Sequence, residues 1–204
     1  VWSQTLLSPL VSSLLFLSVL SLALGNDRDD VLGYSFISFL APGLIAMSIL
    51  TQSFSHSVSS LVISKMQGNI VDMLYAPLSA LEVSMGIIFA AVARSFLIAI
   101  ISIIVFSLIV EMPFNNIFYI FIFSFLSSFI LGSLGFITGL WAEKFDHTAT
   151  ITNFVITPLS FLSGSFYSIE KLPEIFQIIS HINPFFYMID GFRYGFLGVS
   201  DGSI

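Results

Sequence analysis

The stretch EVSMGIIFAAVARSFLIAIISIIVFSLIV, residues 82–110, contains only two charged side chains, those of Glu82 and Arg94. A helix needs about 20 mostly apolar residues to cross the hydrocarbon core of a bilayer. Because this stretch is longer than that and lacks the polar face of a soluble helix, it predicts a membrane-spanning helix.

Four other segments have the same apolar character. Together with the first stretch they predict an all-α polytopic membrane protein with five spans and one membrane domain over residues 1–204. The four segments are residues 5–24, 34–57, 117–141 and 148–167.

The composition supports the same class. The chain has 204 residues, of which 56% are hydrophobic and 9% are charged, whereas a soluble domain carries about 25% charged residues. The net charge of −6 includes no basic cluster, so nothing suggests a nucleic-acid partner. The absence of cysteine excludes a disulfide scaffold and a thiolate metal site.

The first apolar segment has a signal peptide as its alternative interpretation. It is longer than the usual apolar region of about 7–15 residues, and no basic region precedes it, which favours a membrane helix. Because the chain begins with Val1 rather than Met, we expect it to be a fragment. Lys and Arg are balanced between the two predicted sides and do not decide the orientation.

The second and fifth segments each carry a polar stripe at helical spacing. One interpretation is close helix packing; the other is a shared translocation path. Pro42 and Pro158 are expected to kink or open these same two helices, which favours a path. The candidate path residues are Ser48, Thr51, Gln52 and Ser55 in the second segment and Asn153, Thr157, Ser160 and Gly164 in the fifth.

The fourth segment carries small residues about four positions apart. They predict close packing against another helix rather than a path. These residues are Ser124, Ser128, Gly132, Gly135 and Gly139.

Arg94 is the charged residue deepest in a predicted span. One interpretation is a functional charge paired with carbonyls of a broken helix or with a polar stripe. The alternative is that its long side chain extends to the cytoplasmic interface.

No catalytic motif is evident. The chain has no phosphate-binding loop of the GxxxxGK[ST] type. A serine nucleophile at Ser133 or Ser163 would need a nearby base, and the three histidines fall at the predicted span ends or beyond. We therefore expect no catalytic residue, no metal site and no cofactor bound by this chain itself.

Three stretches carry a resemblance to a known family: WSQTLLSPL (residues 2–10), FLAPGLIAMSIL (39–50) and FLSGSFYSIEKLPEIFQIISHINPFFYMIDGFRYGFLGVSD (161–201). Together they resemble the permease subunit of type 2 ABC exporters, the bacterial family of drug and polysaccharide export permeases. The resemblance implies a multi-pass inner-membrane protein with a cytoplasmic N-terminus. It also implies six spans and an interfacial helix before them, so we expect truncation at both ends.

The same resemblance implies the partners. A second permease subunit, expected to be an identical copy, would pair with this chain, and two separate ATP-binding subunits would hold the ATP and Mg²⁺. The function implied is ATP-driven export of a drug, lipid or glycan by alternating access. A non-transporting membrane scaffold is the alternative class.

The resemblance also assigns roles to two polar regions. Residues 58–81 become the cytoplasmic loop whose short coupling helix meets the ATPase, with candidate residues Lys65, Gly68, Asp72, Ala76 and Pro77. Residues 168–204 become external, re-entrant helices divided at Asn183–Pro184. Their candidate gate residues are Asp190, Arg193 and Tyr194, and their predicted interfacial aromatics are Phe185, Phe186, Tyr187, Tyr194 and Phe196.

Overall fold

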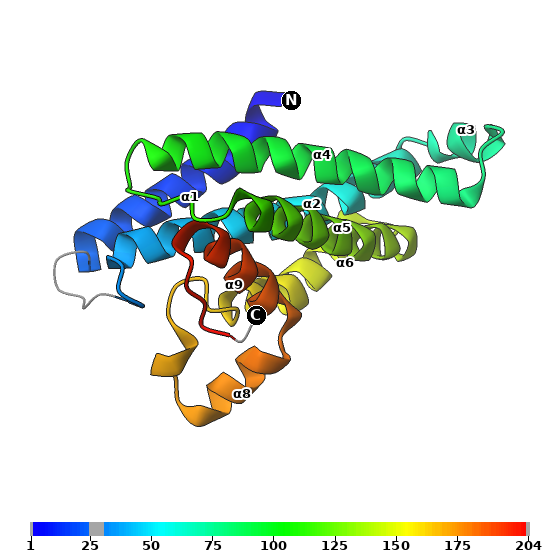
Figure 1. The fold of residues 1–204 in the computed structure, drawn as a ribbon. Coiled ribbons are helices and arrows are strands. Elements are labelled where there is room, and N and C mark those ends of the chain that lie inside the picture. The colour runs from blue at the N-terminus through cyan, green and yellow to red at the C-terminus, as the bar shows by residue number, and fades with distance from the viewer. Residues whose placement is uncertain (1, 25–30, 203–204) are drawn as a thin grey trace.

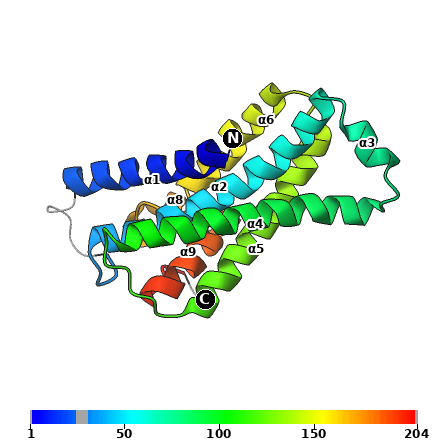
Figure 2. The same ribbon diagram turned by 90° about the horizontal axis from the view of Figure 1, so that it is seen from above.

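The structure is a computed structural model that describes residues 2–24 and 31–202. Four long helices lie side by side in a bundle (Figures 1 and 2). They are α1 (Trp2–Leu24), α2 (Phe36–Met66), α4 (Ala80–Ser107) and α5 (Ile117–Trp141). Among the described residues, the only strand-like pairing is the isolated bridge between Val31 and Tyr34. The all-α membrane class is therefore confirmed.

Three of the described helices, α2, α4 and α5, are long and apolar enough to cross a membrane. The bounds of α5 match the prediction of residues 117–141. The helix α4 begins two residues earlier than predicted because Ser79 and Glu82 form a capping box around its first turn. The helix α1 covers the whole of the first predicted segment, residues 5–24.

The helix α2 differs from its prediction in two respects, at Pro42 and at its C-terminal end. It runs without a break through Pro42 and ends at Met66 rather than at residue 57. Pro42 lies early in the helix, where its missing N–H removes one hydrogen bond and leaves the later turns intact. Residues 58–66 contain no glycine or proline, so helix persists until Gly68, whose φ is +78°. The first part of the predicted coupling loop is therefore helical.

The fifth apolar segment is interrupted, as Pro158 predicts. It consists of α6 (Phe145–Ile151), the π-helical turn η1 (Thr152–Ile156) and α7 (Thr157–Phe161). The N–H of Thr157 bonds to the carbonyl of Thr152, one residue further back than in an α-helix. The helix ends at Phe161, and Gly164 follows with a φ of +70°. The segment is thus shorter than the predicted span of 148–167.

The core forms where α2, α4 and α5 pack against one another. Glycines let α5 approach α2 closely: a Cβ on Gly135 would lie 2.5 Å from the Phe54 carbonyl oxygen, and one on Gly139 would lie 2.9 Å from Leu61. Ser53 adds a hydrogen bond from α2 to the carbonyl of Ser128. The predicted packing role of the small residues in α5 is confirmed.

The short elements sit at different places on the bundle. The helix α3 (Ile70–Tyr75) projects from the end where α2 stops and α4 starts (Figure 1). The turn η2 (Ile169–Lys171), α8 (Glu174–Ile182) and α9 (Pro184–Leu197) follow the interrupted segment. The predicted division at Asn183–Pro184 is confirmed, because the Asn183 side chain accepts a hydrogen bond from the N–H of Phe185 at the start of α9.

The helix α9 packs against α2 and α5 and is mostly buried. The prediction that Phe185, Phe186 and Phe196 are interfacial is wrong, since each is at most 2% exposed. They fill the core because the N-terminal half of α2 and of α5 leaves room for a further helix there. Tyr187 does remain exposed.

Candidate functional site

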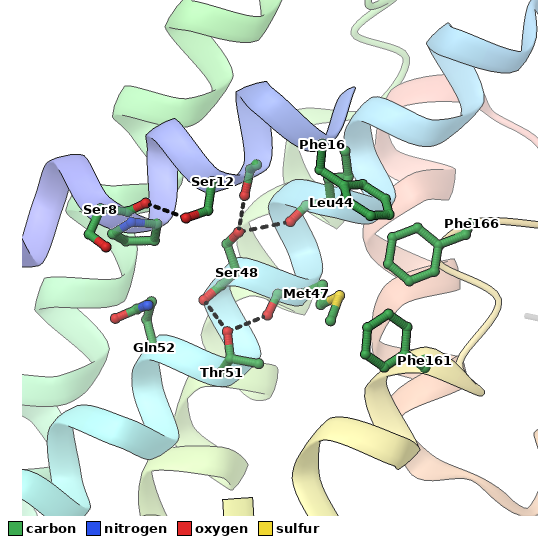
Figure 3. Close-up of a pocket in the computed structure, with 12 residues that line it drawn as sticks. Ser8, Ser12, Phe16, Leu44, Met47, Ser48, Thr51, Gln52, Phe161 and Phe166 are labelled. Carbon is green, nitrogen blue, oxygen red and sulfur yellow. Dashed lines mark hydrogen bonds between the residues drawn. The ribbon is translucent and has the colours of Figure 1, made fainter. Parts of the chain in front are cut away.

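A groove of about 330 Å³ lies between α1, α2 and the loop after α7 (Figure 3). Hydroxyl groups and one amide line it from α1 and α2, while aromatic rings line it from the other side. No lining residue is charged. The polar lining residues are Ser8, Ser12, Ser13, Ser48, Thr51 and Gln52, and the aromatic ones are Phe16, Phe161 and Phe166.

The hydroxyl groups of this groove are held in place by hydrogen bonds. Ser48 donates to the carbonyl of Leu44 at 2.9 Å, and its Oγ lies 2.9 Å from the Oγ of Ser13 on α1. Thr51 donates to the carbonyl of Met47 at 2.9 Å. Since a hydroxyl oxygen keeps acceptor capacity after donating, this wall presents fixed acceptors beside the Gln52 amide.

The aromatic wall is also internally packed. The rings of Phe16 and Phe166 lie 5.1 Å apart between centroids, and those of Phe161 and Phe166 lie 5.4 Å apart. Such distances are typical of favourable aromatic pairs. The groove therefore offers one apolar and one uncharged polar side to the same space.

The structure brings only part of the predicted path together. Ser48, Thr51 and Gln52 line the groove, while Ser55 lies half-buried outside the lining set. The four residues predicted from the fifth segment do not line it. Asn153 is exposed, Thr157 is half-buried, and Ser160 is buried with its hydroxyl donating to Ile156.

The lining residues of α1 and of the loop after α7 were not predicted. A signal was present for α1, because Ser8 and Ser12 are four positions apart and so share a helix face. Phe161, the last residue of α7, and Phe166, in the loop after it, carried no comparable signal, because neither belongs to a polar stripe.

A buried charge cluster lies on α9, around Arg193. The Arg193 side chain is 1% exposed. Its Nη2 donates to the Gly164 carbonyl at 2.8 Å, and its Nη1 lies 3.8 Å from Asp190 Oδ1 and 3.9 Å from Asp201 Oδ2. Gly164, predicted as a path residue, is therefore an anchor for this arginine.

The two carboxylates of the cluster bind backbone groups. Asp190 accepts from the N–H groups of Asp201 and Gly202, both at 3.0 Å. Asp201 accepts from the Ser168 hydroxyl at 2.6 Å and from the Ile169 N–H at 3.3 Å. Burial raises the pKa of the Asp190 carboxyl above its ordinary value, although these N–H donors and the Arg193 charge oppose the rise.

The cluster thus joins α9 to the segment before α8 and to residues 201–202. Of the predicted gate residues, the structure brings Asp190 and Arg193 together. Tyr194 lies outside the cluster and packs on Tyr119, with ring centroids 5.0 Å apart. Asp201 is a member that the gate prediction did not include.

Arg94 lies against a histidine of α2. Its Nη1 is 3.1 Å from the Nδ1 of His56 on α2. His56 had been placed at a span end, but the longer α2 puts it inside the helix, where it is buried. Arg94 as a whole is half-buried.

The predicted coupling residues surround α3, at the end of the bundle. Gly68 makes the turn before it, Asp72 is exposed on it, Ala76 follows it in extended backbone, and Pro77 comes next, in a bend. Three apolar side chains here are exposed, by 78% for Leu74, 86% for Tyr75 and 54% for Leu78. Lys65 instead points to the end of α5.

Within residues 2–24 and 31–202, no group of three or more histidine and acidic side chains is arranged to hold a metal ion. The groove is lined by hydroxyl, amide and aromatic side chains, which can contact both polar and apolar surface.

The comparisons with known proteins agree with these features. Residues 1–197 match the family of ABC-2 type transporters. The inner membrane transport permease YadH of Escherichia coli strain K12 is 34% identical over 98% of this chain and 78% of its own length. Nodulation protein J of Neorhizobium galegae is 27% identical over 95% of this chain and 74% of its own length. This chain therefore belongs to the ABC-2 type transporter family, as a membrane permease subunit of an ABC transporter.

Proposed function

We propose that this permease subunit exports an uncharged amphipathic molecule of the drug, lipid or glycan type by alternating access. The observation that carries the proposal is the groove between α1, α2 and the loop after α7, with its hydroxyl wall and its aromatic wall. A molecule with both polar and apolar surface satisfies both walls, whereas an ion would lose hydration without gaining a partner charge.

The energy would come from the separate ATP-binding subunit, which holds the ATP and Mg²⁺. The helix α3, which projects from one end of the bundle (Figure 1), supports this part because its Leu74 and Tyr75 are exposed. Exposed apolar side chains gathered at one place are typical of a protein-binding surface. We infer that α3 docks on the ATPase with Gly68, Asp72, Ala76 and Pro77 shaping the contact.

We further propose a homodimer of this permease with two ATP-binding subunits, in the bacterial inner membrane and with a cytoplasmic N-terminus. That orientation puts α3 on the cytoplasmic side and α9 toward the outside, since α2 runs from one to the other. The printed name of the relative YadH, an inner membrane transport permease, supports the location.

The buried cluster of Asp190, Arg193 and Asp201 would then hold the outer end of the path closed. Its contacts join α9, the end of the interrupted segment and residues 201–202. Rocking of the helices would have to displace these contacts together. The cluster is thus proposed as a gate anchor rather than as a residue set that touches substrate.

The following experiment distinguishes a transporter subunit from a non-transporting membrane scaffold. The full-length protein and its ATPase partner are reconstituted in vesicles and supplied with a panel of uncharged drugs, lipids and glycans. We expect ATP-dependent uptake of at least one class into inside-out vesicles, together with ATPase stimulation that substitutions of Gly68 or Asp72 abolish. A full-length chain that assembles in the membrane but recruits no ATPase would favour the scaffold.

A further inference from the structure

Lys65 lies in the last turn of α2 and binds the end of a different helix. Its Nζ donates to the carbonyls of Gly139 at 2.9 Å, Leu140 at 2.5 Å and Ala142 at 3.0 Å. An ammonium group has three N–H donors. The three carbonyls of α5 and its cap therefore use all of them.

These carbonyls are ones that α5 cannot satisfy by itself. The helix ends at Trp141, and the last four carbonyls of a helix have no intrahelical N–H partner. The N–H of Ala142 satisfies Thr138, and Lys65 supplies Gly139 and Leu140. Its positive charge also lies at the negative end of the α5 dipole.

Because of its position in the chain, Lys65 also links two short helices through these hydrogen bonds. One residue later α2 ends, and the turn at Gly68 leads into α3. On the other side of the bond, Ala142 leads within three residues into α6, the start of the interrupted segment. The ammonium therefore joins the entry of α3 to the entry of α6.

The helices α2 and α5 are also packed closely beside this bond. Gly139 brings α5 so near to α2 that an added Cβ would lie 2.9 Å from Leu61 and 3.3 Å from Val58. Closely packed helices transmit displacement because their contacts have little free volume. A push on α3 would reach the α5–α6 turn through Lys65 and this contact.

We propose that Lys65 is a positioning residue that transmits movement of α3 to the interrupted segment, and that it does not dock on the ATPase. The proposal rests on the function proposed above, in which α3 receives the push of the ATPase. It assigns to Lys65 a role different from that of Gly68 and Asp72, since its donors face α5.

The experiment uses the full-length permease and its ATPase partner in vesicles, with Lys65→Met, Lys65→Arg and the control Lys144→Met. Lys144 is an exposed lysine near the same end of α5, at the start of α6. Three quantities are measured: ATPase bound per permease, transport per ATP hydrolysed, and the distance between spin labels on Met66→Cys and Glu143→Cys.

We expect Lys65→Met to bind the ATPase normally, to lower transport per ATP by roughly 2- to 30-fold, and to broaden the label distance. Lys65→Arg keeps the charge and N–H donors and is expected to restore both readouts, and Lys144→Met is expected to match the wild type. The label distance is also measured on the permease without the ATPase. A change in distance caused by the substitution itself is then distinguished from one caused by loss of the bound ATPase.

Two results for Lys65→Met would overturn the role of Lys65 without contradicting the proposed function. One is unchanged transport per ATP together with an unchanged label distance. The other is loss of ATPase binding, which would make Lys65 a docking residue. A wild-type permease that binds no ATPase at all would contradict the proposed function instead.

Discussion

The guanidinium carbon of Arg193 lies 3.9 Å from the centre of the Phe39 ring, so the charge of α9 rests on the face of a side chain of α2. A cation over an aromatic ring is stabilised most when both are removed from water, and here Phe39 is fully buried. This contact fixes where the buried charge cluster meets the bundle.

Arg193→Ala should lower both stability and export. Removing one partner of a buried ion pair leaves Asp190 and Asp201 without a counter-charge, which costs on the order of 3–5 kcal/mol. Thermal unfolding of the purified permease in detergent measures this loss. Lys171→Met, an exposed charge removal just before α8, serves as the control and should unfold like the wild type.

The same Arg193→Ala protein should still bind the ATPase, because α3 lies at a different end of α2 from Phe39. Export by vesicles should be impaired. If Arg193→Ala exports as well as the wild type, the cluster does not hold the outer end of the path.

Gly43→Ala should disturb the same place from the side of α2. An added Cβ would lie 2.5 Å from the Ser165 carbonyl oxygen and 3.1 Å from Arg193 Nη2. Such overpacking costs about 1–3 kcal/mol, measured again by unfolding. Gly86→Ala in α4 is the matched control, since its Cβ would meet nothing within 4 Å. Equal unfolding of the two variants would show that the loop after α7 moves aside freely.

Substitutions in the groove should change substrate affinity rather than coupling. Thr51→Val keeps the shape and removes a hydroxyl, and Gln52→Leu removes the amide. Loss of one hydrogen bond of about 0.5–1.5 kcal/mol predicts a rise in the transport KM of roughly 2- to 10-fold, with little change in ATP hydrolysed per molecule moved. Ser107→Ala, at the exposed end of α4, is the control. A KM unchanged in both groove variants would argue against substrate contact there.

The parts of the fold that follow local signals were predictable. The apolar run and the caps define α5, where Asn116 accepts the N–H of Phe118 and the helix ends at Trp141. Ser79 and Glu82 define the start of α4 in the same way. Asn183–Pro184 marks the start of α9.

The parts that depend on distant contacts or on helix phase were not predictable. Lys65 binds carbonyls 74 to 77 positions away, and nothing near it in sequence indicates this. The polar stripe of the fifth segment was predicted for a regular α-helix. The π turn at Thr152–Ile156 adds one residue to a turn and rotates the later side chains by about 100° around the helix axis. Asn153 and Ser160 consequently face different surroundings.

The most direct test of the whole account is the binding of the ATPase to two matched permease variants. Leu74→Asp places a charge on α3, where Leu74 is 78% exposed, and Ile178→Asp places the same charge on α8, where Ile178 is 55% exposed. Affinity for the purified ATPase is measured with each full-length protein in lipid nanodiscs. The account predicts that Leu74→Asp loses ATPase binding while Ile178→Asp binds like the wild type; equal affinity of both variants would contradict it.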